Sequence, residues 1–129
     1  MRNSNRPWRV FFWVALAFNL VAGLPLLIAP GAALAAFGVA VPGDLLFHRF
    51  TGLLVVCFGV LYALVASDAA RFRPLISLGI VGKTGVILLF TQAYLSGGVP
   101  FTAYAMALGD LAFVIGFLTF LFTQRRAQT

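Results

Sequence analysis

Glutamate is absent from this chain, and cysteine and histidine occur once each, as Cys57 and His48. A single cysteine excludes an intrachain disulfide and a CxxC redox pair. One histidine and no glutamate leave too few side chains for a metal site with several His, Cys or Glu ligands. No Cys–His, Ser–His or paired-carboxylate arrangement is available either. We therefore predict no metal, no cofactor, no catalytic residue and no enzymatic activity.

Charged residues are also scarce, at 9%, while 62% of the residues are hydrophobic. This composition is typical of an integral membrane protein. A helix that crosses a bilayer needs about 20 mostly apolar residues, and the apolar runs lack the alternation that barrel strands require. The sequence predicts an all-α fold, an antiparallel bundle of four transmembrane helices in a single integral membrane domain over residues 1–129. The predicted spans cover about residues 10–29, 45–66, 74–95 and 99–123.

The basic residues gather near particular ends of these spans. They precede the first span, join the second to the third and follow the fourth, as Arg2, Arg6, Arg9, Arg71, Arg73, Arg125 and Arg126. Because cytoplasmic loops carry an excess of Lys and Arg, both termini are predicted to be cytoplasmic. Scattered arginines favour the anionic headgroups of membrane lipids as partners and argue against nucleic acid. The first run exceeds the roughly 7–15 residues of a signal-peptide core, so we expect a retained span.

Two charged side chains, Lys83 and Asp110, lie inside the third and fourth spans, and no other charge lies within nine residues of either. A charge near the bilayer centre costs about 2.5 kcal/mol or more and usually marks function or a buried partner. At about 1.5 Å per residue, Asn19, Lys83 and Asp110 all fall within about 4 Å of the centre. A tight turn joins the third span to the fourth. The two spans are therefore antiparallel neighbours, which predicts a Lys83–Asp110 ion pair.

Arg49 lies about 10 Å toward the outer surface, and with Asn19, Lys83 and Asp110 it forms the predicted polar core. Further polar side chains extend this core in the prediction: His48, Tyr62, Thr84, Thr91 and Gln92. Two interpretations stay open. The core either locks the helix register or binds an anionic headgroup, a quinone-like ring or a proton. The surplus of cations favours an anionic ligand, although Arg49 also fits headgroup snorkelling and His48 an interfacial position.

Small residues recur along single helical faces and predict where helices meet, because close approach drives helix packing in lipid. They are Gly52, Gly59, Ala63 and Ala66 in the second span, and Ala105, Gly109, Ala112 and Gly116 in the fourth. Both stripes are expected to face the bundle interior or an identical subunit. Asp44 is the expected N-cap of the second span, and a short helix or loop is expected before it.

A set of short motifs runs through the last three spans: Arg49-Phe-Thr-Gly52, Gly59-x-x-Tyr62, Gly79-x-x-Gly82-Lys83 and Gly109-Asp110. This pattern resembles a set of small bacterial four-helix membrane proteins that are loosely similar to the DoxX-type group. Its distinctive parts are the Gly-Lys and Gly-Asp pairs. The resemblance implies a protein of the bacterial cytoplasmic (inner) membrane and carries over no activity.

The sequence therefore predicts a non-catalytic small integral membrane protein with a buried Lys–Asp pair at the bilayer midplane. Its expected role is that of an accessory subunit or a binder of a lipid or another hydrophobic ligand. The alternative is a homo-oligomeric, proton-coupled small transporter or channel in which Lys83 and Asp110 titrate alternately. Against this alternative, the spans hold no second acidic residue and no broken helix pair. The expected partners are membrane lipids and either identical subunits or a larger membrane complex.

Overall fold

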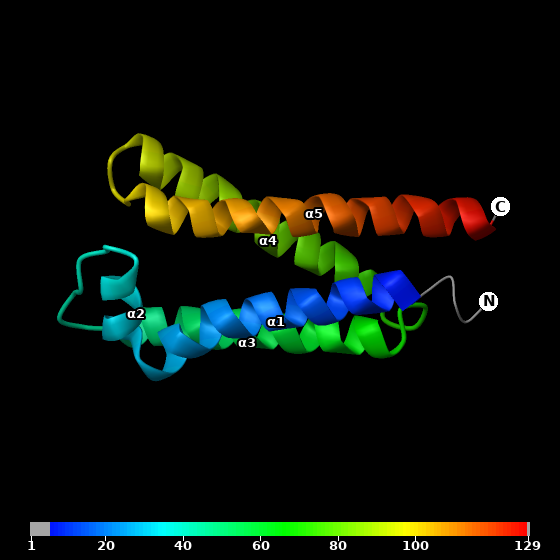
Figure 1. The fold of residues 1–129 in the computed structure, drawn as a ribbon, viewed down its shortest axis with the longest axis horizontal. Helices are drawn as coiled ribbons and strands as arrows, with labels where there is room; N and C mark the ends of the chain where they lie inside the picture. Colours follow the sequence, from blue (N-terminus) through cyan, green and yellow to red (C-terminus); the bar gives the residue numbers. More distant parts are fainter. Residues whose placement is uncertain (1–5, 129) are drawn as a thin grey trace. The chain divides into compact units, whose positions relative to one another are not determined.

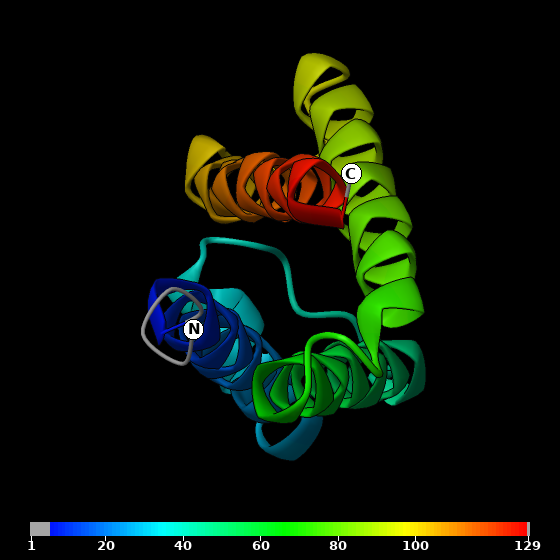
Figure 2. The ribbon, with the colours of Figure 1, turned by 90° about the vertical axis from the view of Figure 1, so that its right-hand side faces the viewer.

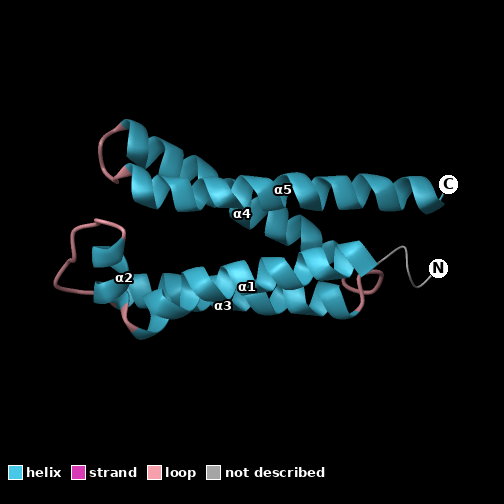
Figure 3. Cartoon of the chain, in the orientation of Figure 1, coloured by secondary structure: helices cyan, strands magenta, loops and turns pink. Residues whose placement is uncertain are grey.

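The computed structural model describes residues 6–128, and the side chains of residues 6–124 (Figure 1). Within that range the chain forms helices and no strand (Figure 3). The helices are α1 (Arg6–Ile28), α2 (Pro30–Ala36), α3 (Leu46–Ser67), α4 (Arg73–Leu95) and α5 (Phe101–Gln128). All but α2 are long and apolar enough to cross a membrane. The predicted all-helical fold with four long apolar helices is therefore confirmed.

The chain divides into two compact units, Met1–Arg73 and Pro74–Thr129, which we call the N-terminal and C-terminal units. The N-terminal unit holds α1, α2 and α3. The C-terminal unit holds α5 and all of α4 after its first residue. The gathering of the four long helices into one antiparallel bundle, and the cytoplasmic position of both termini, stay predictions.

In the N-terminal unit, α1 and α3 run in opposite directions and lie side by side (Figures 1 and 2). α1 continues through Pro25, although proline removes one backbone hydrogen bond, and it ends at Ile28. Pro30 then occupies the first turn of α2, where a missing N–H costs nothing. With seven residues, α2 is too short to cross a membrane. A short helix at this point agrees with the expectation from the sequence.

The start of α3 differs slightly from the prediction. Leu45, and not Asp44, is the N-cap residue. Asp44 still serves the helix start, because its Oδ1 accepts a hydrogen bond from the backbone N–H of Leu46 at 2.9 Å. The first N–H groups of a helix lack intrahelical partners, so a carboxylate one residue earlier can satisfy one of them. The expected N-cap was therefore wrong by one position.

Glycines bring α1 and α3 into backbone contact. A Cβ added at Gly52 would lie 2.6 Å from the backbone nitrogen of Leu27 and 2.8 Å from the carbonyl oxygen of Gly23. A Cβ added at Gly23 would lie 2.9 Å from the carbonyl oxygen of Gly52. Larger residues at either position would force the helices apart, which is how small residues determine helix contacts in lipid. The small-residue face of α3 therefore meets α1.

In the C-terminal unit, a turn over residues 96–100 joins α4 to α5. Gly97 has a positive φ of 78°, a conformation that glycine adopts without the cost a Cβ would bring. The backbone N–H of Gly98 donates to the carbonyl oxygen of Ala93 at 2.8 Å. Such bonds satisfy the last carbonyl groups of a helix, so the turn ends α4 and reverses the chain.

The buried face of α5 is not the one expected from its small residues. It comprises Ala103, Ala107, Asp110, Val114, Phe117 and Phe120. Ala105 and Ala112, which belong to the predicted stripe, are exposed. Of the two alternatives predicted for this stripe, the exposure of Ala105 and Ala112 disfavours the bundle interior. Contact of the stripe with an identical subunit stays a prediction.

Candidate functional site

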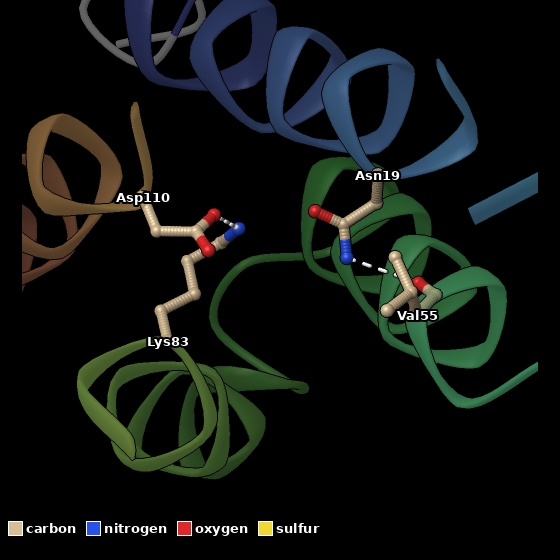
Figure 4. A network of polar contacts seen from close by, with 4 residues as sticks. All are labelled: Asn19, Val55, Lys83 and Asp110. Carbon is tan, nitrogen blue, oxygen red and sulfur yellow. Dashed lines mark hydrogen bonds and ion pairs between the residues drawn. The ribbon is translucent and has the colours of Figure 1, made fainter. Parts of the chain in front are cut away.

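Lys83 and Asp110 form a direct ion pair inside the C-terminal unit (Figure 4). The Nζ atom of Lys83 donates a hydrogen bond to Oδ1 of Asp110 at 2.5 Å. The two side chains are only 7% and 12% exposed. A hydrogen bond between two ionised groups is about twice as strong as one between neutral groups. The structure therefore places in contact the two charges that the sequence predicts to pair.

Phe113 adds an aromatic face to this pair. Its ring centroid lies 5.1 Å from Nζ of Lys83, within the distance at which a cation is attracted to the ring quadrupole. Phe113 follows Asp110 by three residues on α5, and residues at this spacing are neighbours on a helix surface. Phe113 is missing from the predicted site.

A second polar contact lies nearer the turn between α4 and α5. The Thr91 hydroxyl donates to the carbonyl oxygen of Ile87 at 2.7 Å, and its oxygen lies 3.0 Å from the hydroxyl of Tyr104. Because a threonine hydroxyl has one proton, Tyr104 is the donor in this second bond. The ring of Tyr104 also stacks on Tyr94, with centroids 4.8 Å apart. Thr91 was predicted as part of the polar core, whereas the two tyrosines, which flank the turn in the sequence, were missed.

In the N-terminal unit, Asn19 has a partner of its own. Its Nδ2 atom donates to the carbonyl oxygen of Val55 on α3 at 3.0 Å (Figure 4). Asn19 is only 5% exposed, and an amide that is buried without a partner is costly. The bond therefore satisfies one N–H of the amide and ties α1 to α3. A shared polar core of Asn19 with Lys83 and Asp110 stays a prediction.

The remaining predicted site residues differ in burial. Tyr62 is buried and His48 partly buried, whereas Arg49, Thr84 and Gln92 are exposed. The Nδ1 atom of His48 is buried without a hydrogen-bond partner among the residues that the structure describes. Exposure of Arg49 fits a side chain that reaches toward headgroups. The grouping of these residues with the ion pair stays a prediction.

The closed geometry of the ion pair limits its chemistry. Each charge is neutralised by the other at contact distance, which offsets the large cost of a lone buried charge. A ligand that bound Lys83 would have to compete with the carboxylate of Asp110 for the ammonium group. The arrangement is best suited to joining α4 to α5. Proton exchange between the two side chains is the other chemistry that it allows.

Comparisons with protein-family models, with curated proteins and with solved structures found no match to this chain. The class of protein therefore follows from its own helices. Four helices that are long and apolar enough to cross a membrane define a candidate multi-pass membrane protein. At 13.9 kDa, the chain is a small member of that class. Its likeness to the DoxX-type group stays a prediction.

Proposed function

We propose that this chain is a non-catalytic accessory subunit of a larger complex in the bacterial cytoplasmic membrane. The observation that carries the proposal is the closed contact between Lys83 and Asp110 at 2.5 Å. Charges in the middle of apolar helices mark either a functional site or a buried partner. A pair that is already closed fits the second case, so the polar interior supports the fold of this chain and the working surface lies elsewhere.

The outward surfaces of the helices support the same proposal. Large apolar side chains are exposed along α3, α4 and α5, among them Leu53, Leu54, Leu88, Leu89, Ile115 and Leu118. Such surfaces suit contact with lipid and with the helices of another membrane protein. The turn over residues 96–100 is short and offers no room for a site outside the membrane. A small protein of this kind acts through its helical surface.

The proposed orientation places both termini in the cytoplasm. It is supported by Arg6, Arg9, Arg71 and Arg73 at helix ends and by the positive-inside tendency. Arg2, Arg125 and Arg126, which enter the same prediction, lie outside the described side chains. Reporter fusions at Thr129 and within residues 96–98 should report opposite sides of the membrane. Reporters on the same side would overturn the four-span topology.

Native mass spectrometry of the protein extracted from its own membrane in mild detergent tests the accessory role. We expect a complex that contains this chain together with a different membrane protein, at a mass above its own 13.9 kDa. The complex should persist in lipid nanodiscs, which rules out association caused by detergent. Detection of this chain only as a monomer, in both detergent and nanodiscs, would contradict the proposal.

A second candidate function is a homo-oligomeric, proton-coupled transporter or channel. It is favoured by the presence of two buried ionisable side chains, Lys83 and Asp110, within membrane-spanning helices. Masses at whole multiples of 13.9 kDa and proton flux into proteoliposomes would support it. The Lys83→Met variant should then lose that flux. Under the accessory-subunit proposal, the protein alone gives no flux above that of empty liposomes.

A further inference from the structure

One end of the N-terminal unit brings together arginines from two separate segments. The Nε atom of Arg9, in the first turns of α1, donates to the carbonyl oxygen of Ala66 at 3.2 Å. Ala66 lies in the last turn of α3, which ends at Ser67. The start of α1 and the segment that follows α3 therefore lie at the same end of the unit (Figure 1). A cation beside the last carbonyl groups of a helix is also favoured by the helix dipole.

The segment after α3 is wound tightly, which keeps Arg71 near that end. The Oδ1 atom of Asp68 accepts a hydrogen bond from the backbone N–H of Arg71 at 3.1 Å. The backbone N–H of Phe72 donates to the carbonyl oxygen of Asp68 at 3.1 Å. The Oδ1 atom of Asp68 is thus hydrogen-bonded to the backbone. Among the described residues, Asp68 forms no bond to a guanidinium group. Arg71 instead lies over the ring of Phe72, 5.2 Å from its centroid.

Arg6, Arg9 and Arg71, which we call the arginine cluster, are all exposed. Among the residues that the structure describes, none of the three forms an ion pair with a carboxylate. Arg9 uses one of its five N–H donors on Ala66, and this bond holds its guanidinium plane in place while the others stay available. Three cations at the same end of the unit favour an anion there, and guanidinium groups match phosphate oxygens in pairs.

The surface next to the cluster is apolar along the same face of α1. Val10 and Trp13 follow Arg6 by one and two helical turns, and they are 54% and 46% exposed. Residues at this spacing lie above one another on a helix. Tryptophan is enriched at the level of lipid headgroups. A ligand that filled this surface would be anionic at one end and apolar along its length, which is the chemistry of a phospholipid.

We propose that the arginine cluster binds one anionic phospholipid, with its phosphodiester group against Arg6, Arg9 and Arg71. An acyl chain lies along Val10 and Trp13. The apolar surface of Val10 and Trp13 favours a lipid over free phosphate, because free phosphate has no apolar part to contact it. This lipid site is independent of the accessory role, since a chain without a protein partner would still carry it.

Native mass spectrometry of the delipidated, purified protein with added phosphatidylglycerol tests the proposal. We expect one saturable binding event, tighter than that of phosphatidylcholine. The Arg6→Gln/Arg71→Gln variant keeps the Arg9–Ala66 bond and should weaken binding by roughly 30-fold. The control is Thr51→Ala, an exposed residue about 22 Å from Ala66 along α3 at about 1.5 Å per residue, and it should leave the affinity unchanged.

Further arms decide the outcome. Excess inorganic phosphate should not displace the lipid, and displacement by phosphate would assign the cluster to free phosphate. Equal binding of the two lipids, or an equal loss in the Thr51→Ala control, would overturn the site. Should the double variant fail to fold, the salt dependence of the unmodified protein remains decisive. Binding of phosphatidylglycerol that is insensitive to ionic strength would contradict an arginine–phosphate contact.

Discussion

α1 and α3 approach so closely that a Cβ at Gly52 would lie 2.6 Å from the backbone of Leu27. In the C-terminal unit, two polar contacts between α4 and α5 run through side chains: Lys83 reaches Asp110, and Thr91 contacts Tyr104. A Cβ at Gly85 in α4 would touch nothing within 4 Å. Close backbone packing thus joins α1 to α3, whereas two polar bridges link α4 to α5.

The difference follows from the properties of lipid as a solvent. Helices in a bilayer gain no hydrophobic energy from association, so packing and polar contacts decide which faces meet. Glycine permits close packing of helices, and a Lys–Asp pair provides a polar contact. The two kinds of contact also differ in the substitutions that disrupt them. Close packing is broken by added volume, whereas a bridge is broken by removal of one charge.

The largest expected effect is in the C-terminal unit. Lys83→Met should leave the Asp110 carboxylate buried without its partner and lower the free energy of unfolding by about 3–5 kcal/mol. Asp110→Asn should act similarly through the unpaired ammonium group. Unfolding in mixed micelles, with denaturing detergent as titrant, measures both. If either variant were as stable as the unmodified protein, the ion pair would not contribute to the free energy of unfolding.

A smaller effect is expected when volume is added to the N-terminal unit. Gly52→Ala should lower the free energy of unfolding by about 1–3 kcal/mol, the usual cost of overpacking, because the backbone of Leu27 must move. Gly85→Ala is the matched control, since its new methyl group enters open space. The same titration compares the two variants. If Gly85→Ala proved as harmful as Gly52→Ala, the contrast between the units would fail.

Asn19→Leu should have a milder effect in the same unit. It removes the bond to the carbonyl oxygen of Val55, and interhelical hydrogen bonds in membranes contribute about 0.6 kcal/mol on average. Cysteines placed across α1 and α3 should still cross-link in this variant, because glycine contacts persist. A loss of cross-linking would show that the polar bond, and not close packing, joins α1 to α3.

The smallest effect is expected for Tyr104→Phe. The substitution removes the hydroxyl that donates to Thr91 but preserves the stacking on Tyr94, and Thr91 keeps its bond to Ile87. We expect a loss of less than about 0.6 kcal/mol, the average for an interhelical hydrogen bond in membranes, in the detergent titration. A loss as large as that of Lys83→Met would show that the Tyr104–Thr91 bond stabilises this unit as much as the ion pair does.

The four long helices could be predicted because apolar runs of sufficient length have few alternatives in a chain with so little charge. The contact of Lys83 with Asp110 could also be predicted, since both charges are isolated and lie in spans joined by a short turn. The rotation of α5 could not, because two signals competed. A stripe that includes Ala105 and Ala112 indicated one face and a single charge at Asp110 indicated another.

The contributions of Phe113 and Tyr104 were missed for a related reason. Aromatic residues are abundant in this chain, at 15%, so no single ring is distinctive in the sequence. Only the rotation of α5 brings Phe113 to Lys83 and Tyr104 to Thr91. Side-chain partners of this kind depend on helix rotation, which hydrophobicity alone does not determine when every face of a helix is apolar.

A double-mutant cycle on Lys83 and Asp110 tests most directly the claim that their ion pair joins α4 to α5. The four proteins are the unmodified chain, Lys83→Met, Asp110→Asn and the combined variant, each unfolded in the same detergent titration. Because the combined variant leaves no buried charge, it should be more stable than either single variant, which requires a coupling energy at least as large as one single loss, about 3–5 kcal/mol. Losses that simply add, to within about 0.5 kcal/mol, would contradict the account.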